Sequence, residues 1–435
     1  MTGRDQPETP FVSSALQNLR LRGLIEQSTD LQAIDAALNA GMVSFYTGYD
    51  PTAASLHVGH LLTMMAIRQL QRAGHRPIII IGGATAMIGD PTGKSETRKM
   101  LSAEVIETNI VAFRKQLSQF VHFDSGAPND AILLDNSTWL MSIGYVEFLR
   151  DYGRHFTVNR MIAAKTYRDR LEQELPLSFL EFNYQLFQAY DFLHLFRTYD
   201  CTLQLGGSDQ WGNMVAGVEL IRRVFAVEDD AHKTERPPAT AHCITYPLLT
   251  TADGKKMGKT ESGAVWLAAD MLSPFGYYQF WVGCADRDVG HLLDVFTELP
   301  ASERDRLRAL TGADLREAKE ALAYEATKIC HGEKLAEQSR DASRQAFGGG
   351  GDWSAVPCVQ IDEPSIKLVD LVVRPDIAAF KSKREARQRI ENGAVKLNGD
   401  AALDPNMSID LSTQDSPELR LQAGKKRRFR IRFGT

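Results

Sequence analysis

The chain has 435 residues, of which 43% are hydrophobic and 24% charged, a composition that excludes disordered, collagen-like and disulfide-rich proteins. At roughly 150 residues per domain, this length predicts about three folding units. The formal net charge of −5 argues against a nucleic-acid partner, provided that the charge is evenly spread along the chain.

In the first half of the chain, strand and helix patterns alternate. Val43–Tyr46 is predicted to be a strand, His57–Ala73 a helix, Pro77–Ile81 a buried parallel strand and Leu101–Phe120 a second helix. Such alternation favours a parallel α/β sheet. From about Ser273 to Phe347 the strand signals fade and helical periodicity dominates, so we expect a separate helical unit there.

The charge is concentrated in the last part of the chain. Residues 365–435 contain 15 Lys and Arg but only 9 Asp and Glu, a local charge of +6, so that residues 1–364 carry −11. Four consecutive glycines, Gly348–Gly351, precede this basic module and cannot hold a regular element. The sequence therefore predicts a basic C-terminal module behind a glycine linker.

Cysteine usage and hydropathy predict the cellular location. The five cysteines are scattered and form no Cys-x-x-Cys pair, so neither a zinc knuckle nor a disulfide framework is expected. The apolar run Ile78–Ile81 is far shorter than the ~20 residues that span a bilayer. The N-terminal residues lack the basic and apolar regions of a signal peptide. We therefore expect a cytoplasmic protein without a membrane partner.

One segment looks like a phosphate-binding P-loop but has the wrong spacing. Gly89 and Gly93, which precede Lys94 and Ser95, are separated by three residues, whereas the P-loop needs four. Pro91 also removes one of the backbone N–H donors that the loop requires. A tight turn after a strand is the better interpretation.

A second segment is a stronger candidate for a nucleotide site. His57 and His60 share one face at the start of the predicted helix, beside its unpaired N–H groups and the positive end of its dipole. Gly59 between them leaves room for a nucleotide against the backbone. A metal site is the rival interpretation, but the neighbouring sequence has no recognisable metal-ligand pattern. An ordinary surface or core histidine pair is the simplest alternative.

About two hundred residues later a lysine-rich segment follows a turn signal. Asp253-Gly254 predicts the turn, and Lys255, Lys256 and Lys259 come directly after it around a further glycine. Lysines on such a loop suit a polyphosphate, although a solvated hairpin is the simpler interpretation of a charge run.

Together the two segments resemble the HIGH and KMSKS signatures of class I aminoacyl-tRNA synthetases. His57–His60 matches the first signature, and Lys256–Thr260 matches the second with Gly258 and Thr260 in place of its usual residues. The segments around Gly82–Pro91, Tyr184–Asp191 and Gly206–Asn213 resemble those of bacterial tyrosyl-tRNA synthetases in particular. The resemblance implies a Rossmann-like catalytic domain.

By this resemblance the activity is that of a tyrosine-tRNA ligase. Tyrosine and ATP give tyrosyl-adenylate and pyrophosphate, and the tyrosyl group then passes to the 3′-terminal adenosine of tRNA(Tyr). Mg²⁺ is expected with the ATP, without a dedicated protein metal site or a permanently bound cofactor. Catalysis would rest on positioning and charge stabilisation, and the residues expected to act on the phosphates are Thr52, His57, His60, Lys256, Lys259 and Thr260.

The resemblance also implies the substrate contacts. Tyr46 and Asp191 would bind the phenol hydroxyl of tyrosine, and the other expected tyrosine-binding residues are Asp90, Tyr184, Gln188 and Gln210. The expected ATP contacts, besides the two histidines and Lys256 and Lys259, are Gly48, Asp50 and Asp209. Taken alone, the helical spacing of Tyr184, Gln188 and Asp191 fits an ordinary polar stripe equally well.

The C-terminal module has features of an RNA-binding unit. Ser382–Glu385 has the form of a capping box that starts a helix, and Asn398-Gly399 predicts a hairpin. The module resembles an S4-type RNA-binding domain. The final strand alternates Phe429, Ile431 and Phe433 with arginines, so one face should pack and the other should present guanidinium groups to phosphates. The expected tRNA contacts are Lys383, Arg384, Arg387, Arg428, Arg430 and Arg432. A solubilising basic face is the alternative.

These expectations define four regions of the chain. Residues 1–264 would form the Rossmann-like catalytic domain with its N-terminal arm and signature loop, and residues 265–347 a helical domain on the side of the anticodon stem. Residues 348–364 would be the linker, and residues 365–435 the S4-like domain, of α+β type. Family resemblance also implies a homodimer. The alternatives are a tryptophanyl-tRNA synthetase, a nucleotidyltransferase with an HxGH motif, and an RNA-binding relative without activity.

Overall fold

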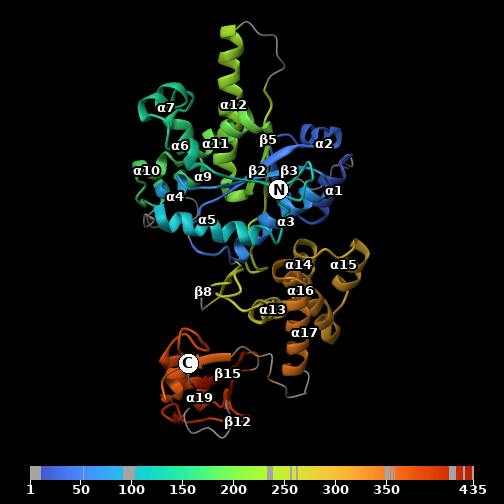
Figure 1. The fold of residues 1–435 in the computed structure, drawn as a ribbon, viewed down its shortest axis with the longest axis vertical. Coiled ribbons are helices and arrows are strands. Elements are labelled where there is room, and N and C mark those ends of the chain that lie inside the picture. The colour runs from blue at the N-terminus through green and yellow to red at the C-terminus, as the bar shows by residue number, and fades with distance from the viewer. Residues whose placement is uncertain are drawn as a thin grey trace. The chain divides into compact units, whose positions relative to one another are not determined.

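The computed structural model describes residues 11–51, 53–91, 103–232, 239–254, 257–260, 263–347, 353, 356, 358–410, 418–424 and 427–433. Two compact units make up the chain (Figure 1). Unit 1 comprises Met1–Lys256 with His291–Phe296, and unit 2 comprises Met257–Gly290 with Thr297–Thr435. No helix within the described ranges combines the length and the apolar character needed to cross a membrane.

Unit 1 is built on a six-stranded sheet with the order β1-β6-β5-β2-β3-β4. The five strands β2 to β6 are parallel, and the short β1 pairs antiparallel with β6 at the edge. The strands are β1 (Gln27–Ser28), β2 (Ser44–Tyr49), β3 (Arg76–Ile81), β4 (Ile132–Asp135), β5 (Cys201–Gly207) and β6 (His242–Tyr246). The predicted parallel α/β sheet is confirmed, whereas the alternating pattern did not predict the antiparallel edge strand.

The strand order reverses between β2 and β5. From β2 the chain continues to β3 and β4 on one side, and later places β5 and β6 on the other side of β2. In open α/β sheets, ligands bind outside the carboxyl ends of the strands at such a reversal. The carboxyl ends of β2 and β5 are therefore the first place to look for a site.

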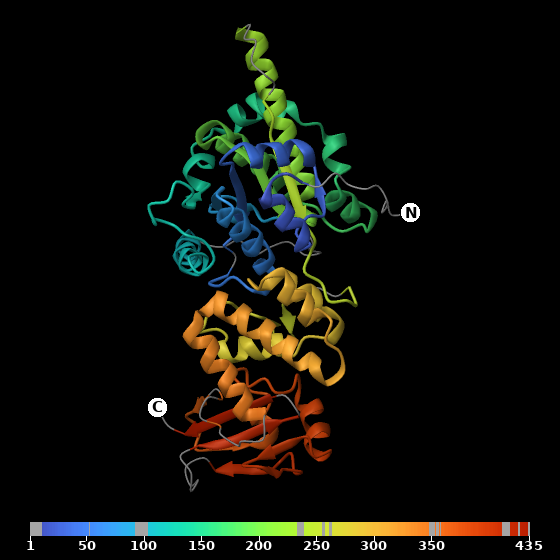
Figure 2. The ribbon, with the colours of Figure 1, turned by 90° about the vertical axis from the view of Figure 1, so that its right-hand side faces the viewer.

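Helices cover both faces of this sheet (Figures 1 and 2). Ile78–Ile81 of β3 are all buried, as expected for a strand that is covered on both sides. Helix α3 (Val58–Arg72) packs on β3, and α11 (Tyr184–Tyr199) and α12 (Trp211–His232) pack on β5. The other helices of unit 1 are α1 (Ser14–Leu21), α2 (Leu31–Ala40), α4 (Thr85–Ile88), α5 (Ala103–Leu117), α6 (Ser137–Leu140), α7 (Tyr145–Asp151), α8 (Val158–Ile162), α9 (Lys165–Glu172) and α10 (Phe179–Phe182), with 3₁₀ turns η1 (Gly153–His155) and η2 (Ser208–Gln210).

The predicted elements are present with shifted ends. The strand expected to end at Tyr46 continues to Tyr49, because its last residues still pair with β3. The helix expected at 57–73 is α3, with His57 and Ala73 as its caps and Gly74 at a φ of 96° just beyond it. The second predicted helix is α5, and its expected first residue lies outside the described residues.

The helical region predicted from Ser273 to Phe347 is confirmed. Ser273 caps its first helix by accepting a hydrogen bond from the Gly276 N–H at 3.1 Å, and the last helix ends at Phe347. Its α-helices are α13 (Pro274–Val282), α14 (Val289–Phe296), α15 (Ala301–Arg308), α16 (Leu315–His331) and α17 (Glu333–Phe347), with 3₁₀ turns η3 (Asp286–Asp288) and η4 (Gly312–Asp314). Within unit 2, α13, α16 and α17 pack against one another.

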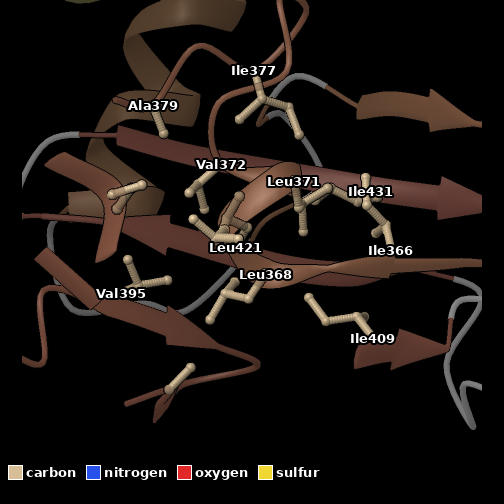
Figure 3. Packing of buried hydrophobic residues seen from close by; sticks show 14 of the residues in the cluster. Ile366, Leu368, Leu371, Val372, Ile377, Ala379, Val395, Ile409, Leu421 and Ile431 are labelled. Carbon is tan, nitrogen blue, oxygen red and sulfur yellow. The ribbon is translucent and has the colours of Figure 1, made fainter. Parts of the chain in front are cut away.

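The C-terminal module is an α+β unit with a five-stranded sheet in the order β12-β11-β14-β15-β9. Its strands are β9 (Cys358–Ile361), β11 (Val395–Leu397), β12 (Asp400–Ala401), β14 (Leu419–Ala423) and β15 (Arg427–Phe433); β10 (Ser365–Lys367) and β13 (Ser408–Asp410) form a separate pair. Helices α18 (Leu368–Leu371) and α19 (Lys383–Glu391) complete it. Its aliphatic core draws on both helices and on the sheet (Figure 3), with Leu368, Leu371, Val395, Leu421 and Ile431 among its members.

One local prediction for this module is confirmed by its geometry, and a second is confirmed in part. Asn398 and Gly399 both have positive φ angles, 50° and 103°, and they join β11 to β12 in a hairpin. Such angles are typical of the tight hairpin turns in which Asn-Gly is favoured. Ser382 caps α19 by accepting from the Glu385 N–H at 3.3 Å. The Glu385 carboxylate, however, accepts from Lys381 rather than from Ser382, so this cap is not the reciprocal box that was predicted.

Candidate active site

The predicted site residues of unit 1 gather at the carboxyl ends of β2 and β5, where the strand order reverses. Tyr46 and Gly48 lie on β2, Asp50 follows it, and Asp209 and Gln210 follow β5 in η2. Gly48 is exposed, and without a side chain it leaves the strand backbone open to a ligand. The order of the strands thus explains why residues about 160 positions apart in the chain share one site.

His57 and His60 cap the start of α3 with their own rings. The Nδ1 of His57 accepts from the Gly59 N–H at 3.0 Å, and the Nδ1 of His60 accepts from the His57 N–H at 3.2 Å. A neutral imidazole whose Nδ1 accepts carries its proton on Nε2. The helix start therefore fixes both histidines as Nε2–H donors, with ring centroids 4.0 Å apart.

The glycine of this motif, predicted to leave room for a nucleotide, also takes part in the helix cap. A Cβ on Gly59 would lie 2.6 Å from Cε1 of His57, which is too close for any side chain. Gly59 therefore allows the His57 ring to fold back over the helix start and make its cap. The close approach that excludes a side chain here comes from this ring.

Asp50 links three elements at the end of β2. Its Oδ1 accepts from the Thr85 hydroxyl at 2.9 Å, and its Oδ2 accepts from the Tyr184 hydroxyl at 3.1 Å. Thr85 begins α4 and Tyr184 begins α11. The first predicted tyrosine-binding residue of α11 is thus tied to Asp50, the predicted ATP-binding residue that follows β2.

Tyr46 and Asp191 form the buried end of the site. Tyr46 is 2% exposed and Asp191 is 4% exposed. The Tyr46 hydroxyl is buried and has no hydrogen-bond partner among the described residues. Burial raises its pKa well above the usual range, and the nearby Asp191 carboxylate raises it further. An unpaired buried hydroxyl is costly, so this group is suited to a ligand that supplies the missing partner.

Two residues that the sequence reasoning missed hold the Asp191 carboxylate. Asn136 donates from Nδ2 to Asp191 Oδ2 at 3.0 Å, and Trp139 donates from its indole N–H to Oδ1 at 2.8 Å. Both lie just after β4, in and before α6. A signal was available, because polar residues that follow a parallel strand at the same sheet edge are expected to converge on the site.

The Asp191 carboxyl is unusually basic. Burial raises its pKa to about 7, against the two hydrogen bonds that lower it, and the charges of Asp50 and Asp135 raise it further. Pairs of shifted groups in a closed pocket are typical of functional sites. The carboxylate accepts two protein N–H groups and, when ionised, retains capacity for a third donor.

A network of hydrogen-bonded polar side chains lies at the more accessible end of the site. Gln210 donates from Nε2 to Asp90 Oδ2 at 2.8 Å. Asn213, another residue that was not predicted, donates to Gln188 Oε1 at 3.0 Å and to Gln210 Oε1 at 3.2 Å. Asp90, Gln188 and Gln210 are all half-buried. The three residues predicted from separate segments are therefore connected in one network.

The structure leaves several predicted residues without a described side chain. Thr52 and Lys256 lie outside the described residues. Lys259 and Thr260 form the short strand β7, which pairs with β8 (Gly263–Ala264) in a hairpin of unit 2, and only their backbone is described. Among the side chains that are described, no group of three or more His, Cys, Asp or Glu residues is placed to hold a metal ion.

The basic residues of the C-terminal module differ in their surroundings. Arg384 and Arg387 are exposed on α19, whereas Lys383 makes an ion pair with Asp370 at 2.6 Å. On β15 the alternation is present, but of the three predicted arginines only Arg432 is exposed, and it lies 3.4 Å from the Glu418 carboxylate. Arg430 bonds to the Val356 carbonyl at 2.7 Å and to Glu418 at 3.3 Å, and the Arg428 guanidinium lies over Trp353 at 5.2 Å. The expected row of three outward guanidinium groups is therefore reduced to one.

Comparisons with known proteins agree with this arrangement. Residues 38–348 match the family model of class I tRNA synthetases for tryptophan and tyrosine, and residues 351–430 match a model of the C-terminal domain of tyrosine-tRNA ligases. A tyrosine-tRNA ligase of Zymomonas mobilis is 46% identical over 98% of this chain and 100% of its own length. One of Caulobacter sp. strain K31 is 48% identical over 96% of this chain and 97% of its own.

Solved structures show the same similarity. A C-terminally truncated mitochondrial tyrosyl-tRNA synthetase of Aspergillus nidulans has a TM-score of 0.67 and 31% identity, over 77% of this chain and 94% of that one. The family model names tryptophan and tyrosine together, whereas these relatives, which match nearly the whole chain, are tyrosine-tRNA ligases.

Proposed function

Because the chain belongs to the tyrosine-tRNA ligases of the class I tRNA synthetase family, we propose that the carboxyl ends of β2 and β5 form the site where it activates tyrosine with ATP. The tyrosine carboxylate forms a bond to the α-phosphorus, the bond from that phosphorus to the β-phosphate oxygen breaks, and pyrophosphate leaves. A hydroxyl of the terminal tRNA adenosine then takes the tyrosyl group and releases AMP.

The first step needs no general base, because the carboxylate is already a nucleophile. The site therefore has to position the reactants and to stabilise the charge that grows on the phosphates. The Nε2–H groups of His57 and His60 are suited to this task, since both are fixed as donors at the start of α3. We assign Thr52, Lys256, Lys259 and Thr260 to the phosphates on the basis of the signature motifs alone.

Our proposal for recognition of the substrate phenol rests on a single observation, the unpaired buried hydroxyl of Tyr46 beside Asp191. A phenol can accept from Tyr46 and donate to the Asp191 carboxylate at the same time. Phenylalanine would fill the space but leave the Tyr46 hydroxyl unpaired and the Asp191 carboxylate without its third donor, which is the kind of loss that gives strong discrimination without editing. Tyrosyl-tRNA synthetase is itself the standard example of that effect.

The half-buried network would hold the other end of tyrosine. We assign Asp90, Gln188, Gln210 and Tyr184 to the α-ammonium group, with Asp90 as the charged acceptor. Gly48, Asp50 and Asp209 would lie along the nucleotide. Because Asp50 already accepts from Tyr184 and Thr85, we expect it to act mainly by fixing these two side chains.

Mg²⁺ is expected to enter with ATP. None of the clusters of His, Cys, Asp and Glu among the described side chains fits a metal ion, so the ion would be held by phosphate oxygens and water. No step above depends on a metal held by the protein.

The C-terminal module is proposed to bind tRNA as an S4-like domain. Exposed cations of this module, among them Arg384 and Arg387 on α19 and Arg432 on β15, support phosphate contacts. The double substitution Arg384→Ala and Arg387→Ala should weaken tRNA binding severalfold and leave tyrosine-dependent pyrophosphate exchange unchanged. Glu391→Gln, at an exposed position of the same helix, is the control. Equal tRNA affinity of the double variant and the control would overturn the assignment.

A homodimer is proposed through an apolar surface on unit 1. Helices α7 and α10 pack inward through Phe148 and Phe182 on one cluster, while Val146 and Phe179 are 77% and 70% exposed. A second copy of this chain is the partner that the family resemblance implies. Val146→Glu with Phe179→Glu should convert a dimer to a monomer in sedimentation equilibrium, and a wild-type monomer would overturn the proposal.

The cytoplasm remains the proposed location. All five cysteines are free thiols, and four of them are buried, as expected for a chain that folds in a reducing compartment.

The amino-acid specificity can be tested directly. Exchange of labelled pyrophosphate into ATP should depend on tyrosine among the twenty amino acids. Exchange driven by tryptophan would favour the tryptophanyl alternative, and exchange with none of them would favour a nucleotidyltransferase or an inactive RNA-binding relative.

A further inference from the structure

His194 lies against the residue that holds Asp191. It is on α11, three positions after Asp191, and its imidazole stacks on the indole of Trp139. The ring centroids are 4.4 Å apart and the planes are 16° from parallel. Neither ring nitrogen of His194 has a hydrogen-bond partner among the described residues, and the imidazole contacts the rings of Trp139 and Tyr190.

Trp139 is held by α11 at two points. Its N–H donates to Asp191 at 2.8 Å, and one face of its indole lies on His194. Trp139 itself belongs to α6, a single turn of four residues, which offers little support to a side chain of this size. The direction of the indole N–H therefore depends on contacts from outside α6.

Two further aromatic rings continue the contacts of His194, first that of Tyr190 and then that of Tyr152. Tyr190 lies 6.4 Å away on the same helix, and Tyr152, which follows α7, packs edge-on against Tyr190 at 4.7 Å. Partial burial lowers the pKa of His194, and the nearby Arg197 lowers it further. Both effects favour the neutral ring, which offers Trp139 an uncharged aromatic surface.

We propose that His194 is a positioning residue for tyrosine recognition, whose imidazole orients the Trp139 indole so that its N–H remains on the Asp191 carboxylate. Without the stack the indole can tilt, and Asp191 loses one of its two protein donors. The carboxylate is then less firmly held and less often ionised, so it accepts the substrate phenol less well. The inference rests on the recognition role proposed above for Asp191.

The test compares two substitutions that differ in one property. His194→Ala removes the stack, whereas His194→Phe keeps a flat ring of similar size without nitrogen atoms. Thr198→Ala, an exposed position one turn further along α11, is the matched control. Aromatic pairs of this kind contribute enough for a change of about three- to tenfold in an equilibrium constant.

We expect His194→Ala to raise KM for tyrosine about three- to tenfold, with kcat and KM for ATP within about twofold, as for an effect confined to substrate binding. His194→Phe and Thr198→Ala should retain the wild-type KM. Pyrophosphate exchange with phenylalanine should not change in any of them, because phenylalanine offers no hydroxyl to Asp191. A general loosening of the fold would instead alter all of these constants together.

Two results would overturn the proposal. One is an unchanged KM for tyrosine in His194→Ala, and the other is a loss in His194→Phe as large as that in His194→Ala. The parallel measurement on Asp191→Asn distinguishes failure of the role proposed for Asp191 from failure of the role proposed for His194. If that variant also keeps the wild-type KM, the role of Asp191 fails; if only His194→Ala keeps it, the positioning role alone fails.

Discussion

The two ends of the proposed tyrosine site, a phenol end and an ammonium end, are built in different ways. The phenol end, with Tyr46 and Asp191, is buried, and it contains an unpaired hydroxyl and a carboxyl whose pKa is raised to about 7. The ammonium end, with Asp90, Gln188 and Gln210, is half-buried, and its side chains already bond to one another or to Asn213.

Because of this difference, we expect the buried end to determine which amino acid is chosen and the accessible end to contribute mainly to affinity. At the buried end a ligand must satisfy groups that water cannot reach, so a wrong ligand leaves a large penalty. At the accessible end water can replace a missing ligand contact, so the loss is limited to the charge-assisted bond itself. We therefore expect substitutions at the buried end to change the choice of amino acid, and those at the accessible end to change affinity.

The largest effect is expected from Asp191→Asn. The amide turns an N–H toward one of the two donors, Asn136 or Trp139, and removes the charged acceptor of the phenol. We expect kcat/KM for tyrosine to fall about a thousandfold, with the value for phenylalanine nearly unchanged, as measured by pyrophosphate exchange. A fall of similar size for both amino acids would contradict the difference between the two ends, since it would indicate that the whole site is disrupted.

The next effect is expected from Asp90→Asn at the accessible end. Loss of a charge-assisted bond to the ammonium group should lower kcat/KM about a hundredfold. Tyrosine and phenylalanine should be affected equally, because both carry this group. Glu172→Gln, which neutralises an exposed carboxylate on α9, serves as the control. A selective loss for tyrosine would mean that the two ends are not separate.

The pH dependence should also distinguish the ends. Because burial raises the pKa of Asp191 from 3.8 to about 7, the folded protein binds this proton more tightly than the unfolded chain. Its contribution to the free energy of unfolding is therefore greatest at low pH and is lost as the pH rises from about 4 through about 7.

Tyrosine affinity should change in the opposite direction, because the phenol needs an ionised acceptor. Binding measured without ATP should be about tenfold weaker at pH 6 than at pH 8, given a pKa of about 7. The Asp191→Asn variant should show a flat profile over this range. A persistent pH dependence in that variant would assign the titration to another group.

The smallest effect is expected from Tyr46→Phe. Loss of one neutral hydrogen bond should weaken tyrosine binding about fivefold. The midpoint of thermal unfolding without ligand should not fall, because the removed hydroxyl has no partner among the described residues. A clear drop in that midpoint would show that the hydroxyl stabilises the free protein and does not await a substrate.

The sequence predicted the parts of this site that lie in local motifs. The histidine pair and its helix, the strand Ile78–Ile81 and the hairpin at Asn398-Gly399 all follow from short-range patterns, and the structure contains them. Asn136, Trp139 and Asn213 were missed. The place of Asn136 and Trp139 after β4 is a signal only once that strand is recognised, and β4 was not among the predicted strands. The tertiary fold alone brings Asn136 within 3.0 Å of Asp191.

The C-terminal module shows the limit of periodicity as a guide to exposure. The alternation in β15 predicted which face carries the arginines, and Ile431 does pack in the core. It did not predict that Trp353, Val356 and Glu418 would cover Arg428 and Arg430. Alternation assigns a residue to a face of a sheet, but what covers that face depends on distant segments.

Helix α11 also fixes the separation of two residues of the proposed site. It carries Gln188 from one end of the site and Asp191 from the other, about 4.5 Å apart along the axis at a rise of about 1.5 Å per residue. The separation of the two backbone positions that carry these side chains is therefore set by the hydrogen bonds of the helix. An isomer of tyrosine with its hydroxyl at the meta position has the same groups at another separation, so it should satisfy one end at a time. The helix thereby makes molecular length a criterion of selection alongside chemical identity.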